Sequence, residues 1–540
     1  MIVQEIIANM TPLRAVASIL GFFVLTSFFT GVYYDRRVRR LGAHAPRVKI
    51  YLPLGLDFIY KAIKANKDKQ ELQFWDRTLA KAGPYTGPGK TANLEVNSNS
   101  KFRLIFTVDP ENIKAVLTGQ FADFGKGHKF HEEWKDFLGD SIFATDGELW
   151  SGSRHLIRPM FARDRIVDTE IFEKHIHKLI PMLGGSKNPS QSKVVDVQPF
   201  FFQFTLDAAT DYLLGHSVDS LDNPKTVFAE SFQYVLHRQS MLFRAGPPTS
   251  PVSPLMSRVE FRANLKKMDD FMQPFIDEVL SMTPEELENR LAKQDTFLHA
   301  LARFTRDPKV IRDQLVAILL AGRDTTAATL SFCLFELSRN PAVVSKLRTE
   351  ILERCGSTRK PSYSDLKEMK YLTAVLNEAM RLYPVVPFNV RHSLKDTTLP
   401  RGGGPDGRSP IGVPEDTRIA YSTMYMQRRP ELYDPPPMSG DEKRAVPYFD
   451  PAKFIPDRWV SGWQPKPWHF IPFNGGPRIC LGQQFATLEM GYTVTRILQH
   501  YSEIQAVGAP PVGVDPVFKF DVTLSADQEL NMVFVKAEGK

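Results

Sequence analysis

The sequence predicts a mainly α-helical protein with small β-sheets, folded as a single large domain behind an N-terminal transmembrane helix. Apolar residues recur with helical periodicity through the middle of the chain, over residues 200–214, 227–242, 259–280 and 310–337. Only short pieces have the character of strands, near residues 104–108, 418–421 and 532–535. No fixed-period repeat and no long linker divides the chain after its first fifty residues.

Composition narrows the class of protein. A chain of 540 residues can bury a large core, and 43% hydrophobic with 24% charged residues is ordinary globular usage, which excludes a disordered or collagen-like chain. Three cysteines exclude a disulfide-stapled scaffold and a multi-cysteine zinc array. The net charge of +7 is small for this length, so nucleic-acid binding is not predicted. A basic surface for an anionic membrane or an acidic protein remains compatible with it.

Residues 15–34 form an uncharged stretch of the length that a membrane-spanning helix needs. Four arginines follow almost at once, at positions 36, 37, 39 and 40, and such residues remain on the cytoplasmic side. A cleaved signal peptide would have a shorter apolar region and a small-residue cleavage site. We therefore expect a lumenal segment (1–14), a signal-anchor helix (15–34), a basic linker (35–50) and a cytosolic catalytic domain (51–540). The alternative for residues 15–34 is a buried core helix.

The long helix expected over residues 310–340 is apolar on most faces but carries polar residues at its centre. Gly322, Asp324, Thr325 and Thr326 are poor helix formers, and a buried acid beside two hydroxyls needs an explanation. One explanation is a local kink in which the threonine hydroxyls bond back to the preceding turn. The other is a polar notch that faces a bound group.

A second helix is expected over residues 365–383. Glu378 and Arg381 lie three residues apart in it, so they share a face and can form an ion pair. Such pairs are usually solvated. Pro384 and Pro387 then end the helix.

Cys480 lies in the segment FNGGPRICLG (473–482), where glycines on both sides suit a tight loop with a closely approaching backbone. A helix is expected directly after it, over residues 481–488, and its N-terminus would stabilise a thiolate. From the residues alone, Cys480 is a nucleophile, a metal ligand or an inert buried thiol.

This segment resembles the haem-binding signature of the cytochrome P450 family, F-x-x-G-x-R-x-C-x-G, at every fixed position. The matching residues are Phe473, Gly476, Arg478, Cys480 and Gly482. Four further family motifs occur in the family's order. They are W-x-x-x-R at Trp150 and Arg154, AGRDTT at 321–326, E-x-x-R at Glu378 and Arg381, and FIPDRW at 454–459, which contains Arg458. The likeness runs from about residue 45 to the C-terminus.

The resemblance implies a role for each matching residue. Cys480 would be the axial thiolate of a haem b iron, the sole protein ligand of that metal. The other residues implied in haem binding are Trp150, Arg154, Arg391, Phe473 and Arg478, and the arginines suit the propionates. Asp324 and Thr325 resemble the acid–alcohol pair that relays protons during oxygen activation. Glu378, Arg381 and Arg458 would form a structural ion network.

Electrons would come from a partner, because no flavin or nicotinamide domain fits the remaining length and no G-x-G-x-x-G follows a strand. The resemblance implies NADPH–cytochrome P450 reductase of the endoplasmic reticulum membrane, with cytochrome b5 as an optional second donor. NADPH and flavins would then act only through that reductase. Arg158, Arg163 and Arg165 are candidates for its docking surface.

Three segments, at residues 205–215, 399–411 and 473–486, resemble the fungal subfamily that hydroxylates n-alkanes and fatty acids at or near the chain end. The pocket residues implied by the resemblance are Phe121, Phe124, Ala317, Leu320, Ala321, Val385, Val386, Phe388 and Leu524. The connection over residues 241–254 would enter the bilayer. Ala321 stands where some animal fatty-acid hydroxylases have a haem-linking glutamate, so no ester bond to haem is expected.

Two alternatives remain at this stage. One is a tailoring P450 that hydroxylates a polyketide or terpenoid in secondary metabolism. The other is a haem-binding or electron-transfer protein without oxygen activation, which would not need Asp324 and Thr325.

Overall fold

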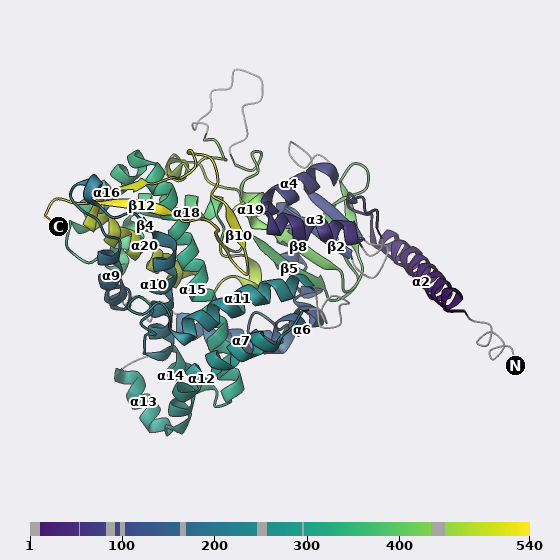
Figure 1. Cartoon of the computed structure of the whole chain (residues 1–540), viewed down its shortest axis with the longest axis horizontal. Helices are drawn as coiled ribbons and strands as arrows, with labels where there is room; N and C mark the ends of the chain where they lie inside the picture. The colour runs from purple at the N-terminus through teal and green to yellow at the C-terminus, as the bar shows by residue number, and fades with distance from the viewer. Residues whose placement is uncertain are drawn as a thin grey trace, which may run out of the picture. The chain divides into compact units, whose positions relative to one another are not determined.

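The computed structural model describes residues 11–52, 55–82, 92–97, 103–161, 169–245, 256–293, 296–433 and 449–539. Backbone contacts group the chain into two compact units. Their helices and strands are labelled in Figure 1. The first, called the sheet unit, comprises residues 1–125 and 389–422, and the second, called the helical unit, comprises residues 126–388 and 423–540. The sequence predicts a single domain across both units.

The sheet unit is built on a five-stranded sheet of order β1-β2-β8-β5-β3. These strands are β1 (Asn93–Asn97), β2 (Arg103–Thr107), β8 (Arg418–Ser422), β5 (Phe388–Ser393) and β3 (Phe124–Gly125). β2 pairs with β1 antiparallel and with β8 in parallel. The unit's other elements are α2 (Pro12–Leu41), α3 (Leu56–Lys67), α4 (Glu71–Ala82), α5 (Pro110–Lys114), the short helices Ala115–Gly119 and Phe121–Asp123, and the hairpin of β6 (Thr397–Gly403) and β7 (Ser409–Val413). Its core includes Trp75 stacked on Phe106, with ring centroids 4.6 Å apart.

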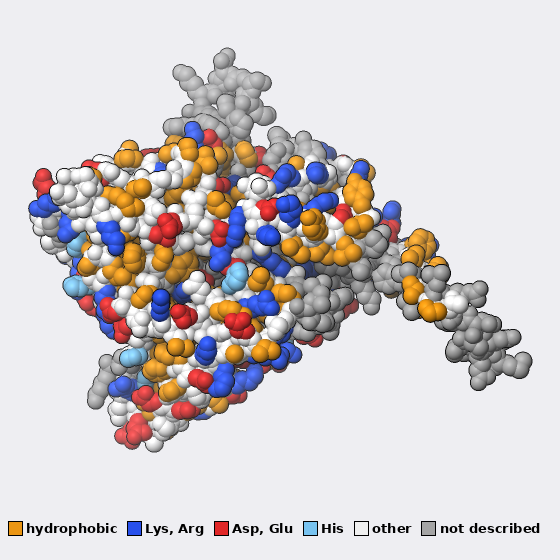
Figure 2. All heavy atoms as spheres, viewed as in Figure 1, with side chains coloured by type: hydrophobic (Ala, Val, Ile, Leu, Met, Phe, Trp, Pro, Cys, Tyr) orange, Lys and Arg blue, Asp and Glu red, His pale blue; other side chains and the backbone are white. Residues whose placement is uncertain are grey.

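The predicted spanning segment is helical, since it lies within α2. Orange apolar side chains lie on the surface of the α2 helix (Figure 2). Phe22 is 71% exposed and Phe29 is 66% exposed. Among the described residues, the helix that is long and apolar enough to cross a membrane is α15 (Pro308–Arg339), a core helix whose most apolar stretch is 78% buried within the protein. Residues 1–10 of the predicted lumenal segment lie outside the described residues. Membrane crossing by α2 therefore stays a prediction.

The helical unit contains the helices predicted from periodicity, with ends that differ by a few residues. Its helices up to α15 are α6 (Gly127–Leu138), α7 (Gly147–Ile157), α9 (Glu170–Met182), α10 (Val197–Leu214), α11 (Val227–Ala245), α12 (Val259–Ser281), α13 (Pro284–Lys293), α14 (Phe297–Phe304) and α15. Those after α15 are α16 (Pro341–Cys355), α17 (Tyr363–Glu368), α18 (Lys370–Leu382), α19 (Thr423–Gln427) and α20 (Gln483–His500). Short 3-10 helices occur at Arg158–Phe161, Pro189–Gln191, Pro456–Trp459 and Gly476–Arg478.

Two small antiparallel sheets complete the helical unit. One has the order β4-β12-β9, from β4 (Val195–Asp196), β12 (Asn531–Lys536) and β9 (Tyr501–Ala506). The other is the hairpin of β10 (Phe518–Phe520) and β11 (Leu524–Ala526). The mainly helical fold with small sheets is therefore as predicted.

Helix α15 is the core helix of this unit and packs against α10, α18 and α20 (Figure 1). It begins where the Asp307 side chain accepts hydrogen bonds from the backbone N–H groups of Lys309 and Val310, and Pro308 occupies its first turn. Asn340 ends it and Pro341 opens the next helix. Helix α15 begins two residues earlier than the predicted start at residue 310.

The single helix predicted over residues 365–383 is wrong, because the structure breaks it at Met369 into α17 and α18. A capping box formed by Ser362 and Asp365 starts α17. The carboxylate of Glu350 then accepts hydrogen bonds from the backbone N–H groups of Tyr371 and Leu372, both at 2.8 Å. A side chain from α16 thus satisfies the first turn of α18, so the two helices need not be continuous.

Candidate active site

The loop that carries Cys480 is closed by backbone hydrogen bonds. The N–H of Cys480 donates to the carbonyl of Phe473 at 3.0 Å, and Gly476 has a positive φ of 69°. A Cβ atom added at Gly475 would lie 2.6 Å from the Trp468 ring, so this position needs glycine for the close approach. Helix α20 begins three residues after Cys480, close to where the sequence predicted it, and directs its N-terminus to this loop.

Cys480 differs from the other two cysteines, which are both buried, because its side chain is exposed. Protein atoms nevertheless surround its sulfur closely, and this burial raises the pKa of the thiol. The N–H of Gly482 and the positive charge of Arg154 act in the opposite direction and favour the thiolate. The result is a cysteine that reaches the surface of the loop and whose sulfur has groups nearby that stabilise its anion.

Two arginines and a tryptophan lie beside this cysteine. Arg154 of α7 donates a hydrogen bond from Nη1 to the carbonyl of Ile479 at 3.0 Å. The guanidinium carbon of Arg478 lies 4.5 Å from the Trp150 ring centre, and that of Arg154 lies 6.0 Å from it. Arg478 also donates to the carbonyl of Thr145 at 2.9 Å. The structure therefore brings together the predicted residues of α7 and of the cysteine loop, including Phe473 through its carbonyl.

Arg391 belongs to the other unit. It lies on β5 of the sheet unit, is 3% exposed, and donates from Nη1 to the carbonyl of Val390 at 2.9 Å. Its predicted role toward haem stays a prediction.

One face in the middle of α15 is partly exposed, although most of the helix around it is buried. Ile318, Ala321, Gly322 and Thr325 are half-buried and recur at i, i+3, i+4 and i+7, so they form one stripe. Thr325 donates from Oγ1 to the carbonyl of Ala321 at 2.6 Å. The hydroxyl of Thr325 bonds back to the preceding turn, as the first explanation of this segment predicts. It also lies on a partly exposed face, as the second explanation, a polar notch, requires.

Asp324 does not contact Thr325 through any hydrogen bond in the described structure, although the sequence grouped the two as a pair. Its side chain is buried, and Oδ1 accepts from Nη1 of Arg323 at 2.9 Å. Oδ2 faces the hydroxyl of Thr523 at 3.5 Å. Burial raises the pKa of Asp324, and the Arg323 guanidinium opposes this rise. Sequence reasoning missed Arg323, although a second charge beside a buried acid in AGRDTT was a signal.

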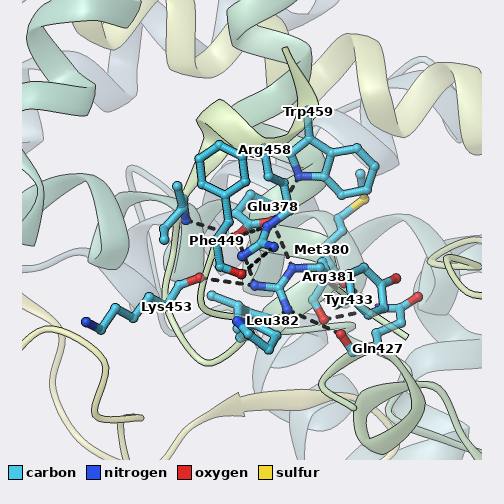
Figure 3. A network of polar contacts seen from close by, with 12 residues as sticks. Glu378, Met380, Arg381, Leu382, Gln427, Tyr433, Phe449, Lys453, Arg458 and Trp459 are labelled. Carbon is cyan, nitrogen blue, oxygen red and sulfur yellow. Dashed lines mark hydrogen bonds and ion pairs between the residues drawn. The ribbon is translucent and has the colours of Figure 1, made fainter. Parts of the chain in front are cut away.

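Glu378 is the centre of a buried ion network (Figure 3). Its carboxylate accepts from Arg381 Nε at 2.8 Å and from Arg458 Nε at 3.1 Å, and all three side chains are fully buried. Trp459 adds a hydrogen bond from its indole N–H at 2.9 Å, a partner that sequence reasoning missed. Although burial opposes it, the two guanidinium groups lower the pKa of Glu378.

The remaining N–H groups of both arginines donate to backbone carbonyls. Arg381 donates to the carbonyls of Gln427 and Lys453, and Arg458 donates to that of Phe449 (Figure 3). Arg381 also donates to the carbonyl of Pro451, and Arg458 to that of Asp450. The network thus fixes the chain that leads from α18 to the segment before the cysteine loop. It contains the predicted contact among Glu378, Arg381 and Arg458. Unlike most glutamate–arginine pairs on helix surfaces, this network is fully buried.

Comparison with known proteins identifies the family. The model of the family "Cytochrome P450" matches residues 98–511. This chain belongs to the cytochrome P450 family. It is 44% identical over 533 residues to Cytochrome P450 monooxygenase pvhE of Talaromyces variabilis, covering 96% of this chain and 95% of that protein. It is 40% identical to Cytochrome P450 52A6 of Candida tropicalis (80% and 81% covered) and 37% identical to Cytochrome P450 52-M1 of Starmerella bombicola (97% and 98% covered).

The protein is therefore a P450 monooxygenase, an oxidoreductase, and the family uses haem b with a thiolate ligand and NADPH electrons from a reductase. The donor set at Cys480 fits this group, because a thiolate-forming sulfur lies near Arg154. Arg478, which also pairs with Asp146 at 2.5 Å, stacks on Trp150. Guanidinium groups of this kind suit propionates.

Sequence reasoning missed one further residue of this P450. Glu489 of α20 is 2% exposed, and the Thr326 hydroxyl of α15 forms a hydrogen bond to its carboxyl group. Burial raises its pKa from the ordinary 4.5 to about 8, so the group is mostly neutral at pH 7. The signal was an acid inside the apolar helix that follows the cysteine loop.

The predicted pocket residues fall into several environments. The helical unit extends to Phe388, the first residue of β5, and within it Val385, Val386 and Phe388 are partly exposed after α18. The N–H of Leu524 donates to the carbonyl of Val385 at 2.9 Å. The side chains of Ala317, Leu320 and Leu524 are buried. Phe121 and Phe124 lie in the sheet unit.

Some predictions fall on residues without a described structure. Arg163 and Arg165 lie outside the described residues, as does most of the predicted bilayer-entering connection, residues 246–254. Arg158 is described and exposed.

Proposed function

We propose that this P450 inserts one oxygen atom into a C–H bond at or near the end of a long-chain aliphatic substrate, a fatty acid or an n-alkane. The observation that carries the proposal is the accessible stripe of α15, where Ile318, Ala321 and Gly322 present no charge and Thr325 is the only hydroxyl. Val385, Val386 and Phe388 add partly exposed apolar side chains in the same unit. An apolar chain loses less hydration free energy on entering such surroundings than a polar substrate would.

Similarity to relatives supports the same substrate class. The segments at residues 205–215, 399–411 and 473–486 resemble the fungal alkane and fatty-acid hydroxylases, and several Cytochrome P450 52 proteins of Candida and Debaryomyces species are 34–40% identical to this chain. Similarity of sequence transfers the reaction more reliably than the substrate, so the substrate needs its own test.

The residues have distinct proposed roles in this reaction. Cys480 would bind the haem iron through Sγ, and Arg154 and Arg478, supported by Trp150, would hold the propionates. When bound, the haem supplies the oxygen-activating chemistry. Thr325 would hold or pass a proton at Oγ1 on the accessible face of α15, and Asp324 would supply that proton from its carboxyl group. Phe473 would keep the cysteine in place through its carbonyl, and Arg391 is a further candidate ligand of the propionates.

We also propose that α2 anchors the protein in the endoplasmic reticulum membrane as a single span, with the catalytic units in the cytosol. The exposed Phe22, Phe28 and Phe29 suit hydrocarbon surroundings. The arginines after residue 35 suit the cytosolic side. In that membrane NADPH–cytochrome P450 reductase would be the electron donor, with cytochrome b5 as an optional second one, and a lipid substrate would enter from the bilayer.

A second candidate substrate is a polyketide or terpenoid with an aliphatic part, hydroxylated in secondary metabolism. It is favoured by the 44% identity to pvhE of Talaromyces variabilis, a relative outside the Cytochrome P450 52 group. The third alternative, haem binding without oxygen activation, is not retained because the chain belongs to a monooxygenase family.

The test is turnover by the full-length protein with reductase and NADPH on a panel of fatty acids and n-alkanes of increasing chain length. We expect mass spectrometry to find hydroxylated products that carry the oxygen at or near the chain end. A haem-loaded preparation that is reduced by its partner but hydroxylates no member of the panel would overturn the proposal and favour the second candidate.

A further inference from the structure

The guanidinium group of Arg323 is enclosed inside the helical unit. Its side chain is 6% exposed, and its guanidinium carbon lies 5.1 Å from the ring centre of Phe202 of α10 and 5.3 Å from that of Phe232 of α11. Its backbone carbonyl accepts a hydrogen bond from the hydroxyl of Thr205 at 2.9 Å. The backbone bond fixes the position of Arg323 on α15, and because its side chain is buried against both rings, the guanidinium has little freedom to move away from Asp324, its ion-pair partner at 2.9 Å.

The second oxygen of Asp324 faces the β10–β11 hairpin. Thr523, between the two strands, points its hydroxyl at Oδ2. The hairpin is itself fixed, because the N–H of Leu524 bonds to the carbonyl of Val385 and the N–H of Ala526 bonds to the Gln198 side chain at 2.9 Å. Asp324 is therefore held from both sides by groups that are anchored independently.

The charged groups around this carboxylate come from three elements. Arg323 lies on α15 with Asp324, and Asp521 of the hairpin is close enough to raise the pKa of Asp324. Asp521 is in turn paired with Lys519 at 3.0 Å and with His237 of α11 at 3.2 Å. Half of the His237 side chain is exposed. Polar groups of the hairpin and of α11 thus lie between Asp324 and the half-exposed His237. Thr325 lies instead on the partly exposed stripe of α15.

We propose that Arg323 is a positioning residue for Asp324, which it holds as a carboxylate oriented toward Thr523, so that Asp324 takes up protons from the hairpin side. The inference rests on the proposed role of Asp324 and names the residue on which that role depends. Without the Arg323 cation, the buried carboxyl group of Asp324 would be protonated and free to rotate. An acid that stays protonated at the working pH cannot release a proton, so it cannot relay protons to Thr325.

A double-mutant cycle separates positioning from general damage. We expect Arg323→Met to lower the product formed per NADPH consumed by about tenfold or more, as when a proton-transfer group is lost. Asp324→Asn should have an effect of similar size. The combined Arg323→Met/Asp324→Asn variant, which buries no unpaired charge, should fold and be no worse than Asp324→Asn alone. Arg323→Lys, which keeps the charge, should recover part of the yield.

A second readout does not depend on turnover. In the resting holoenzyme, the infrared C=O band of protonated Asp324, assigned by its loss in Asp324→Asn, should persist to higher pH in Arg323→Met than in the natural protein. Equal titration midpoints in Arg323→Met and the natural protein would overturn the inference. So would a double variant whose loss of product yield equals the product of the losses in the two single variants. This titration needs no substrate, so it can be measured even if the proposed substrate class is wrong. A failure of the proposed function is therefore distinguishable from a failure of the positioning role.

Discussion

Arg154 donates a hydrogen bond to the carbonyl of Ile479, the residue that precedes Cys480, at 3.0 Å. This bond ties α7 to the cysteine loop and places a permanent positive charge near the sulfur, where it favours the thiolate. Two motifs that are far apart in the sequence, W-x-x-x-R and the cysteine signature, therefore meet in one site.

The first prediction concerns this bond. Arg154→Ala should reduce the haem retained per protein by about tenfold, because a charged hydrogen bond contributes about 1.5–3 kcal/mol and each 1.4 kcal/mol is about tenfold in affinity. Arg154→Lys should retain more haem, since it keeps the charge. Absorbance of haem relative to protein after purification measures this. The exposed Arg158→Ala is the matched control, and equal haem content in Arg154→Ala and the control would contradict the assignment.

The second prediction concerns the buried ion network. Glu378→Gln should destabilise the protein by about 3–5 kcal/mol, because it leaves Arg381 and Arg458 as buried charges without a carboxylate. The exposed pair of Lys266 and Asp270 serves as the control, and Asp270→Asn should cost no more than about 0.5 kcal/mol. Urea unfolding of the two variants measures both effects. Equal midpoints would show that the network does not hold the fold.

The sequence allowed the core helix and the cysteine loop to be predicted, because their determinants are local. Helix α15 follows from its apolar run and from the Asp307–Pro308 start, and the cysteine loop follows from its glycines and signature. The break at Met369 could not be predicted, because the cap of α18 comes from Glu350 on another helix. The direction of the Asp324 side chain depends on Thr523, which is distant in sequence, so periodicity could not reveal it.

The third prediction concerns Glu489, whose pKa is raised to about 8. The folded protein binds a proton at this site that the unfolded chain releases near pH 4.5, so the protonated site favours folding below that pH. That contribution should decline by up to about 1.4 kcal/mol per pH unit as pH rises toward 8. Glu489→Gln keeps a neutral partner for Thr326 and should remove this decline. The measurement is the unfolding midpoint of both proteins at pH 6 and pH 8.5, and an unchanged pH dependence in the variant would refute the assignment.

The fourth prediction concerns α2. Removal of residues 1–34 should move the protein from the membrane pellet to the soluble fraction, because burial of each large apolar side chain in lipid contributes about 1.5–3 kcal/mol. The full chain, washed with alkaline carbonate, should stay in the pellet. Fractionation followed by immunoblotting measures both, and a full chain released by the carbonate wash would argue against a spanning helix.

The most direct test of the whole account is the absorbance spectrum of the reduced, carbon-monoxide-treated protein, compared with that of Cys480→Ser. With Cys480 as the iron ligand, the natural protein should show the strongly red-shifted Soret band of a thiolate-bound haem, and the variant should lose it together with oxidative turnover. A Cys480→Ser protein that keeps both the band and the turnover would contradict the account.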